Sequence, residues 1–394
     1  MWYARDRQYI PLETVEDVDK ISQCVYYELH LDNHPTVYAL RHSAHTSMVS
    51  RGMYYRSMVY ALRHSAHASM VLRGMYYRSR EYHMEKFNSN FEIKSIIQYV
   101  KRIAVVTGGK RGIGFEICKQ LVSSDRDLLV VITAKDEQKG LQSLDKLRTL
   151  GLSENVAVRQ LNVKNPASIA SFADFINTKF GKLDILVNNA GVNGIIVDEK
   201  NLNVKPDEVT GVKQYMTKQI MLQTYETAKD CIETNYYGTK HVTEALLPFL
   251  NMSTSPRIVN ISTGISKLEN IKDDRMKKML SNVDGLTEDV LEEVVTGFLR
   301  DAKDNLLEEK GWDEPFSAYI VSKTVINAYT RVLAKKYPSF RINTVNPGFT
   351  KTEMTHYQGI YTPDEAAKGP VRLALIPDEG PSGRFFFQTE ETNF

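Results

Sequence analysis

The sequence has few cysteines, no long apolar run and almost no net charge. Its 394 residues include only three cysteines, Cys24, Cys118 and Cys231, which lie far apart and form no CxxC pair. This argues against a disulfide framework and against a cysteine-based zinc site, and it favours a reducing, cytoplasmic location. No stretch of about 18 apolar residues occurs, and residues 1–17 lack the apolar centre of a signal peptide, so we expect no membrane insertion.

Positive and negative charges are nearly balanced. Lysine and arginine number 50, against 48 aspartates and glutamates, which leaves a net charge of +2. This balance offers no basic field for nucleic acid or an anionic membrane, so a small molecule is the expected partner. With 42% apolar and 25% charged residues, the chain has the composition of a globular protein with one large or two modest domains.

Residues 1–83 differ from the rest because they contain a 22-residue tandem repeat, in which residues 37–57 recur almost unchanged as residues 59–79. A solenoid core needs about three repeats, so we expect a poorly ordered basic extension. Weak nucleic-acid binding by its arginines is an alternative. Its histidine pairs are a poor metal-ligand set without nearby cysteines or carboxylates, and we predict no metal site. These histidines are His42, His45, His64 and His67.

From residue 100 onward, short β-branched runs alternate with helical segments. Seven runs are expected to be strands: Ile103–Thr107, Leu128–Thr133, Val156–Val163, Ile185–Asn188, Ile258–Ile261, Ile342–Val345 and Arg384–Phe387. Several are continuously apolar, as strands buried on both faces are, and the segments between most of them can hold crossover helices. Residues 100–394 are therefore predicted to form one α/β domain, a Rossmann-type doubly wound parallel sheet of about seven strands.

The first strand runs into a glycine-rich turn, TGGKRGIG, that opens an amphipathic helix. Gly108, Gly112 and Gly114 are spaced Gly-x-x-x-Gly-x-Gly. Such a turn lets the backbone approach a pyrophosphate and points the amino end of the helix at it. Taken alone the pattern is weak, because an ordinary tight turn has a similar composition.

Six motifs follow one another in the order found in the short-chain dehydrogenase/reductase family. They are TGGKRGIG at residues 107–114, NNAG at 188–191, Asn235, the pair Ser262–Thr263, YIVSK at 319–323 and NPG at 346–348. The chain resembles this family over residues 100–394, and within it the monomeric carbonyl-reductase branch with plant enzymes similar to salutaridine reductase and neomenthol dehydrogenase. The resemblance implies NADPH-dependent reduction of a ketone or aldehyde on a small apolar molecule, terpenoid-like or alkaloid-like, to the alcohol.

Tyr319 and Lys323 are the predicted catalytic pair. Carbonyl reduction needs a proton donor for the oxygen, and a free tyrosine with a pKa of about 10 serves near neutrality only beside a positive charge. A spacing of four along a helix places Lys323 on the same face as Tyr319, where its ammonium can lower that pKa and hold the nicotinamide ribose. A chance pair on a surface helix is the alternative, which the other motifs disfavour.

The resemblance implies roles for two further polar positions. Thr263 stands where the family has the serine that hydrogen-bonds the substrate oxygen, and Ser262 precedes it. Threonine offers an equivalent hydroxyl on a stiffer side chain, so whether Thr263 or Ser262 donates stays open. Asn235 resembles the asparagine that holds a water in the proton relay to the lysine, and a structural helix asparagine is the alternative.

Basic residues near the second strand favour NADPH over NADH. An NADP site surrounds the 2′-phosphate with basic groups, whereas an NAD site carries an acid for the ribose hydroxyl. Lys135 and Arg111 are the basic candidates, and Asp136 could favour NAD, although a helix cap is its expected role. The resemblance adds these cofactor contacts: Gly108, Lys110, Gly112, Ile113, Gly114, Asn162, Val163, Asn189, Ala190, Gly191, Tyr319, Lys323, Pro347, Gly348, Thr350 and Thr352.

Two insertions, residues 192–234 and 264–318, separate the chain from the shortest family members. The second contains a predicted amphipathic helix with Thr287 as N-cap. Its apolar stripe consists of Val290, Leu291, Val294, Val295, Phe298 and Leu299. The resemblance implies that the insertions line the substrate pocket and cover the surface through which shorter relatives oligomerise, so we expect a monomer. In the first insertion, the candidates for facing either substrate or core are Tyr215, Met216, Met221 and Tyr225.

Three competing functions remain open. One is reduction of an activated carbon–carbon double bond, which the intact Tyr319 disfavours because that residue serves protonation at oxygen. Another is an NADPH-binding scaffold that has lost activity, suggested by Thr263 and Asn162 where relatives have serine and aspartate. The third is a basic interaction protein that acts through residues 1–83.

Overall fold

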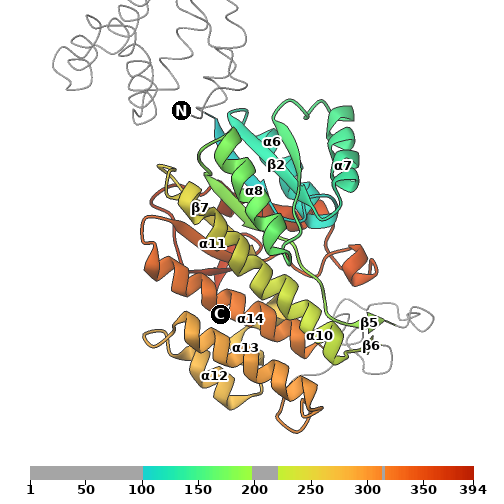
Figure 1. Cartoon of the computed structure of the whole chain (residues 1–394), viewed down its shortest axis with the longest axis vertical. Coiled ribbons are helices and arrows are strands. Elements are labelled where there is room, and N and C mark those ends of the chain that lie inside the picture. Colours follow the sequence, from blue (N-terminus) through green and yellow to red (C-terminus); the bar gives the residue numbers. More distant parts are fainter. Residues whose placement is uncertain (1–100, 198–220, 313–315) are drawn as a thin grey trace, which may run out of the picture. The chain divides into compact units, whose positions relative to one another are not determined.

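The computed structural model describes residues 101–197, 221–312 and 316–394, and the structural statements below concern these residues. Residues Arg102–Phe394 form one compact unit (Figure 1). Several sequence-based expectations lie outside the described residues. They are the extension of residues 1–83 with its repeat, the histidines His42, His45, His64 and His67, and the pair Tyr215 and Met216.

An eight-stranded sheet in the order β10-β9-β8-β7-β4-β1-β2-β3 forms the centre of the unit Arg102–Phe394. Its strands are β1 (Arg102–Val106), β2 (Leu128–Ala134), β3 (Val156–Gln160), β4 (Ile185–Asn188), β7 (Arg257–Ile261), β8 (Arg341–Asn346), β9 (Phe385–Phe387) and β10 (Glu390–Thr392). Neighbours are parallel except β10, which pairs antiparallel with β9. The predicted doubly wound α/β fold is confirmed, with an additional edge strand and with β3 ending at Gln160 rather than Val163.

Helices cover both faces of the sheet (Figure 1). One face carries α6 (Gly112–Ser124), α7 (Glu137–Thr149) and α15 (Pro363–Ala374), and the other carries α8 (Pro166–Lys179), α11 (Gly238–Leu250) and α14 (Ser317–Lys336). Alternate residues of β1 enter the two cores: Ala104 and Val106 pack on the α6 side, Ile103 and Val105 on the α11 side. All four are fully buried, as expected for a strand that is apolar from Ile103 to Val106.

The insertions add helices beside the core. They form α10 (Tyr225–Ile232), the short 3₁₀ turns η3 (Gly264–Ser266) and η4 (Leu268–Asn270), α12 (Asp274–Ser281) and α13 (Glu288–Lys303). The π-helical turn η2 (Glu233–Tyr237) begins at the end of the first insertion and continues beyond it. A small antiparallel pair, β5 (Ile196–Val197) and β6 (Met221–Leu222), belongs to the first insertion. Met221, 4% exposed, is part of the core, as is the partly buried Tyr225 at its margin.

Helix α13 confirms the amphipathic prediction. The Thr287 side chain caps it by accepting the N–H of Val290 at 3.4 Å, and the apolar stripe packs toward α10 and α14. In Figure 1, α12 and α13 lie together on the outer side of α14. Among the described helices, none is both long and apolar enough to cross a membrane.

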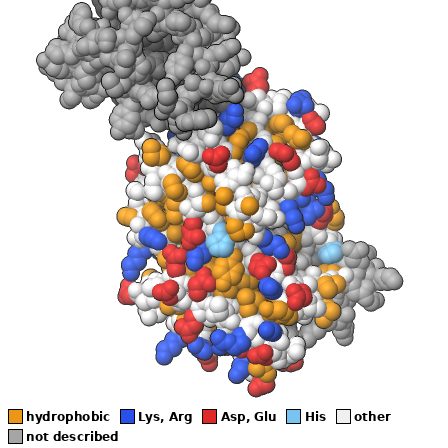
Figure 2. Space-filling view, viewed as in Figure 1, with side chains coloured by type: hydrophobic (Ala, Val, Ile, Leu, Met, Phe, Trp, Pro, Cys, Tyr) orange, Lys and Arg blue, Asp and Glu red, His pale blue; other side chains and the backbone are white. Residues whose placement is uncertain are grey.

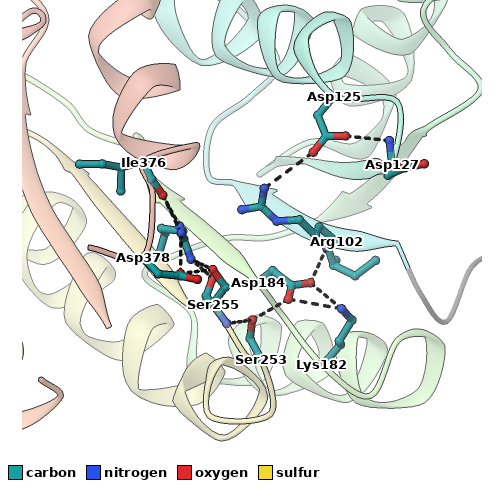
Figure 3. Close-up of polar contacts among 11 residues, drawn as sticks. Arg102, Asp125, Asp127, Lys182, Asp184, Ser253, Ser255, Ile376 and Asp378 are labelled. Carbon is teal, nitrogen blue, oxygen red and sulfur yellow. Dashed lines mark hydrogen bonds and ion pairs between the residues drawn. The ribbon is translucent and has the colours of Figure 1, made fainter. Parts of the chain in front are cut away.

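At the amino ends of β1, β4 and β7, the buried residue Asp184 joins three strands through its carboxylate and its backbone carbonyl (Figure 3). Asp184, 3% exposed, accepts the N–H of Ile103 at 2.8 Å with Oδ2 and the hydroxyl of Ser253 at 2.6 Å with Oδ1. Its Oδ2 also lies 3.0 Å from Lys182 Nζ, and its backbone carbonyl accepts the N–H of Arg257 at 2.9 Å. Both carboxylate oxygens are thus partnered, and this end of the sheet is a structural anchor.

Charges of both signs are interspersed over the face of the molecule seen in Figure 2. Opposite charges also form ion pairs, such as Arg275–Glu293 between α12 and α13 and Lys336–Glu288 between α14 and α13. This face therefore presents no extended field of one sign that would steer a polyanion toward it.

Candidate active site

The six motifs meet at one edge of the sheet. The parallel strands β1, β4, β7 and β8 end at the same edge, and the glycine turn, NNAG, Ser262–Thr263 and NPG follow them directly. The chain runs outward from β1 to β2 and β3 on one side, and from β4 to β7 and β8 on the other. The carboxyl ends of β1 and β4 are thus a topological switch point, where ligands bind in open α/β sheets.

The glycine-rich turn packs tightly against the NNAG segment. Gly108 has φ +66°, and a Cβ there would lie 3.1 Å from the Cα of Ala190. A Cβ on Gly114 would lie 2.5 Å from Asn189 Nδ2, which itself donates to the carbonyl of Thr107 at 2.9 Å. Both positions therefore require glycine, as a turn that brings backbone close to a ligand does.

Thr107 is a site residue that the sequence analysis did not single out. Its buried hydroxyl oxygen accepts the N–H groups of Asn189 at 2.9 Å and of Ala190 at 3.0 Å. The hydroxyl locks the turn after β4 to the turn after β1. Its position as the first letter of TGGKRGIG, between a strand and a glycine turn, was the available signal.

Helix α6 begins at Gly112 without a side-chain cap. Its N-cap residue is Arg111, whose side chain makes no capping hydrogen bond. Free N–H groups and the positive end of the helix dipole make such an end suited to an anion. Gly112 has φ +55°, and a Cβ there would lie 3.4 Å from Thr352 Cγ2, so the loop after β8 borders the same end. This arrangement fits the pyrophosphate of a dinucleotide.

Basic side chains gather between this turn and the end of β2. Burial lowers the pKa of Lys110, and the charges of Arg111, Lys139 and Lys135 lower it further, against an opposing influence of Asp136. Several cations close enough to influence one titration form a positive region that suits a phosphate monoester.

Asp136 has the helix-capping role that the sequence predicted. Its side chain accepts the N–H of Gln138 at 3.0 Å at the start of α7. Arg111 forms an ion pair with Glu353 of the turn η5 (Glu353–Thr355), and both side chains are more than half exposed. Because exposed ion pairs are weak, this guanidinium can exchange its carboxylate partner for a phosphate.

Tyr319 and Lys323 lie on one face of α14. Lys323 is 4% exposed, its Nζ lies 5.9 Å from the centre of the Tyr319 ring, and it donates to the carbonyl of Ile261 at 2.7 Å. Burial lowers the pKa of Lys323 to about 8 and raises the pKa of Tyr319. This direction is opposite to the lowering by the ammonium that the sequence analysis expected, and its main cause is burial.

Asn235 lies at the centre of the π-helical turn η2 and is fully buried. Its Oδ1 accepts the N–H of Val192 at 2.9 Å, and its Nδ2 donates to the carbonyl of Val192 at 2.9 Å and to Ser322 Oγ at 3.0 Å. Ser322 in turn donates to the carbonyl of Tyr319 at 2.8 Å. Asn235 thus joins the segment after NNAG to helix α14, and π-helical turns occur frequently at functional sites.

Gly191 separates Asn235 from Lys323. A Cβ at this position would lie 3.1 Å from Asn235 Oδ1 and 3.5 Å from Lys323 Nζ. The amide and the ammonium are therefore neighbours across a residue without a side chain. A larger residue would fill the space between them.

Ser262 and Thr263 differ in how their hydroxyls are engaged. Ser262 is 3% exposed, and its Oγ lies 3.1 Å from Ser266 Oγ and 3.5 Å from the carbonyl of Lys323. Thr263 is half-buried, its carbonyl accepts the Ser266 hydroxyl at 2.6 Å, and its own hydroxyl makes no hydrogen bond to any described residue. Within this pair, the hydroxyl that is available to a ligand belongs to Thr263.

The loop after β3 holds two more of the expected cofactor contacts. Asn162 is half-buried and accepts the N–H of Lys164 at 3.2 Å with its Oδ1. Val163 packs on the start of α11, where a Cβ on Gly238 would lie 2.8 Å from its Cγ2. Both residues lie beyond the carboxyl end of β3, at the ligand edge of the sheet.

The loop after β8 holds the remainder, from Pro347 onward. Gly348 has φ +87°, and its N–H donates to Asn346 Oδ1 at 2.9 Å. Thr350 is 3% exposed and donates to the carbonyl of Gly348 at 2.9 Å, so its hydroxyl stabilises the loop itself. Thr352 is half-buried and approaches the glycine turn, as described above.

Comparison with known proteins agrees with this geometry. A family model described as short chain dehydrogenase matches residues 102–272. The chain is 46% identical over 296 residues to (+)-neomenthol dehydrogenase of Arabidopsis thaliana, covering 74% of this chain and 98% of that protein. It is 35% identical over 289 residues to carbonyl reductase (NADPH) 3 of Rattus norvegicus, covering 71% and 92%.

Among solved structures, salutaridine reductase from Papaver somniferum matches with a TM-score of 0.69 and 47% identity, covering 73% of this chain and 99% of that one. The predicted resemblance to the plant enzymes of this branch is confirmed. The chain belongs to the short-chain dehydrogenase/reductase family and is an oxidoreductase that acts on carbonyl or alcohol groups.

Proposed function

We propose that the protein reduces a ketone or aldehyde on a small apolar molecule, terpenoid-like or alkaloid-like, to the alcohol with NADPH. The observation that carries the proposal is that Tyr319 and Lys323 lie on one face of α14, where Lys323 Nζ contacts the carbonyl of Ile261, just before Ser262 and Thr263. The names of the relatives, a neomenthol dehydrogenase, a salutaridine reductase and a carbonyl reductase (NADPH), support the same substrate class and cofactor.

NADPH, when bound, supplies the hydride, and the side chains supply the rest. Tyr319 donates a proton to the carbonyl oxygen as negative charge develops there. The Lys323 ammonium holds the nicotinamide ribose and stabilises the tyrosinate that forms. Asn235 lies next to Lys323 across Gly191 and is suited to hold the water that returns a proton.

Thr263 is the proposed hydrogen-bond donor to the substrate oxygen. Its hydroxyl is unengaged and half-buried, whereas the Ser262 hydroxyl is buried against Ser266 and the backbone of Lys323. The Ser262 side chain therefore supports the loop.

The preference for NADPH rests on the basic region at the end of β2. Lys110, Arg111 and Lys135 offer positive charge for the 2′-phosphate, while Asp136 is engaged as a helix cap.

Two further proposals concern the oligomeric state and the location of the protein. The added helices α12 and α13 cover the outer side of α14, which favours a monomer, and the free buried thiols of Cys118 and Cys231 favour a reducing, cytoplasmic location.

The test is cofactor oxidation by the full chain against a panel of cyclic ketones, quinones and an enone, with NADPH and NADH in parallel. We expect turnover of saturated ketones and at least about tenfold higher kcat/KM with NADPH, because a 2′-phosphate gains charge-assisted hydrogen bonds. Tight NADPH binding without turnover on any carbonyl would favour a scaffold. Turnover confined to the double bond of the enone would favour the alternative reductase.

The same assay distinguishes the two hydroxyls. Thr263→Ala should lower kcat by about 100-fold, as loss of one donor to a developing oxyanion does, and Thr263→Ser should retain most activity. Ser262→Ala is the matched control and should alter kcat far less. The reverse ranking would transfer the donor role to Ser262.

A further inference from the structure

Helix α13 reaches the active-site turn through one carboxylate. Glu292 accepts the hydroxyl of Tyr237 at 2.8 Å with Oε2 and the hydroxyl of Tyr236 at 3.1 Å with Oε1. Its Oε1 also accepts from Lys240 Nζ at 3.0 Å. Both tyrosines belong to η2, and Tyr236 follows Asn235 directly. One acid on the second insertion therefore binds the residues that adjoin the buried asparagine.

The ionisation states suit this arrangement. Burial raises the pKa of Tyr236 and Tyr237, and the negative charge of Glu292 raises it further, so both remain hydrogen-bond donors. Burial alone would raise the pKa of Glu292, but the hydrogen bonds from Tyr237 and Lys240 and the ammonium charge lower it below its usual value. The carboxylate stays ionised, and its hydrogen bonds are of the stronger, charge-assisted kind.

The π-helical form of η2 needs such support. A π turn contains one more residue per turn than an α-helix and persists mainly where side chains favour it. If the turn reverted to an α-helix, the residues on one side would rotate by about 100°, the angle of one helical residue. Such a rotation would take the Asn235 amide away from Val192 and Ser322, which it now contacts at 2.9 and 3.0 Å.

We propose that Glu292 is a positioning residue for the reaction, which fixes the π-helical turn through Tyr236 and Tyr237 and thereby holds Asn235 beside Lys323. The inference rests on the proposed function, because it assigns Asn235 to the proton relay. It also gives the second insertion a role in the active site, in addition to covering helix surfaces.

Glu292→Gln is the first test, made in the full chain. A glutamine has one acceptor oxygen and one donor NH₂, so one tyrosine hydroxyl loses its acceptor. We expect kcat to fall by about tenfold, since small displacements of active-site groups have effects of this size, with KM for NADPH unchanged within about twofold. The solvent deuterium isotope effect on kcat should rise, because a displaced asparagine slows proton transfer and leaves cofactor binding intact.

Glu288→Gln is the matched control. Glu288 lies one turn earlier on α13 and pairs with Lys240 at 3.4 Å and Lys336 at 3.3 Å, yet it contacts neither tyrosine. This variant loses a comparable charge from the same helix, so a general loss of stability would appear in both. We expect its kcat and isotope effect to equal those of the wild type.

Tyr237→Phe removes the partner hydroxyl of the same hydrogen bond, and it tests the proposal if Glu292→Gln does not fold. It should lower kcat, and the double variant Glu292→Gln/Tyr237→Phe should lose no more than the larger single effect, because the two residues share one interaction. Unchanged kcat in both single variants, or an equal fall in Glu288→Gln, would overturn the positioning role while wild-type turnover leaves the proposed function standing. A wild type without turnover would overturn both.

Discussion

In the part of the chain that the structure describes, polar groups have hydrogen-bond partners at one end of the parallel sheet and some lack them at the other. At the amino ends, both oxygens of Asp184 are partnered, and Arg257 donates to the carbonyl of Ile376 at 3.0 Å and to Asp378 at 2.8 Å (Figure 3). At the carboxyl ends, the hydroxyls of Tyr319 and Thr263 have no hydrogen-bond partner among the described residues.

This difference separates stability from function along a single sheet. Buried polar groups with hydrogen-bond partners stabilise the folded state. Groups without a partner reduce its stability and are available to bind a ligand. Substitutions at the carboxyl ends should therefore remove activity with little effect on stability. Substitutions at the amino ends should do the reverse.

Tyr319→Phe should produce the largest effect. Removal of the proton donor should lower kcat by about 1,000-fold or more, while the dissociation constant for NADPH changes by less than about twofold. The melting temperature should stay close to that of the wild type, because the lost hydroxyl makes no hydrogen bond to the described residues. Steady-state kinetics, cofactor titration and thermal melting measure these three quantities.

Tyr329→Phe is the control for that substitution. Tyr329 lies on the same helix, and its buried hydroxyl has no partner among the described residues. Its removal should leave kcat unchanged and stability equal or slightly higher, since an unsatisfied buried hydroxyl is unfavourable. Substantial turnover by Tyr319→Phe would exclude Tyr319 as the proton donor.

Asp184→Asn should reverse the pattern. In the variant, the amide NH₂ would replace a carboxylate oxygen that now accepts from a backbone N–H or a lysine, so two donors would face each other. We expect a loss of about 2–3 kcal/mol of unfolding free energy. The activity of the remaining folded protein should change by less than about twofold. Urea denaturation measures the loss, and Asp145→Asn, which breaks the exposed pair with Arg148, should change stability by less than about 0.5 kcal/mol. Equal losses in the two variants would contradict the anchor role.

The sequence predicted the position of the active site at the carboxyl ends of the strands more completely than it predicted the outermost strands of the sheet. Buried parallel strands are apolar on both faces, and their carboxyl ends share one edge, so the order of the motifs implied their meeting place. Strand β10 was missed because Glu390–Thr392 is polar and pairs only at the edge. The last residues of the predicted third strand, up to Val163, instead form the loop that carries Asn162.

Tertiary contacts explain what the sequence left out of the site. Glu292 and Tyr237 are 55 positions apart and join only because α13 folds back on η2. The choice between Ser262 and Thr263 depended on Ser266. Its hydroxyl contacts the hydroxyl of Ser262 but only the backbone carbonyl of Thr263, which leaves the Thr263 hydroxyl without a partner among the described residues. The pKa of Tyr319 was misjudged because spacing alone reveals the neighbouring lysine but not the extent of burial.

Lys323→Met should change stability less than Asp184→Asn does, and in the opposite direction. Burial depresses the native pKa of Lys323 from 10.5 to about 8, so below pH 8 the folded protein holds a charge that would be better solvated in the unfolded chain. Replacement by a neutral side chain of similar length should therefore raise the unfolding free energy at pH 7 by about 1–2 kcal/mol, after allowance for the lost hydrogen bond to Ile261.

The pH dependence gives this last prediction its sign. Between pH 8 and 10.5 the unfolded chain still binds the lysine proton while the folded protein releases it, so the wild type gains stability relative to the variant as pH rises. The advantage of Lys323→Met should shrink through this window, as denaturant unfolding at pH 7 and pH 9.5 would show. A variant less stable than the wild type at pH 7 would mean that the carboxyl ends, like the amino ends, are arranged for stability at this position.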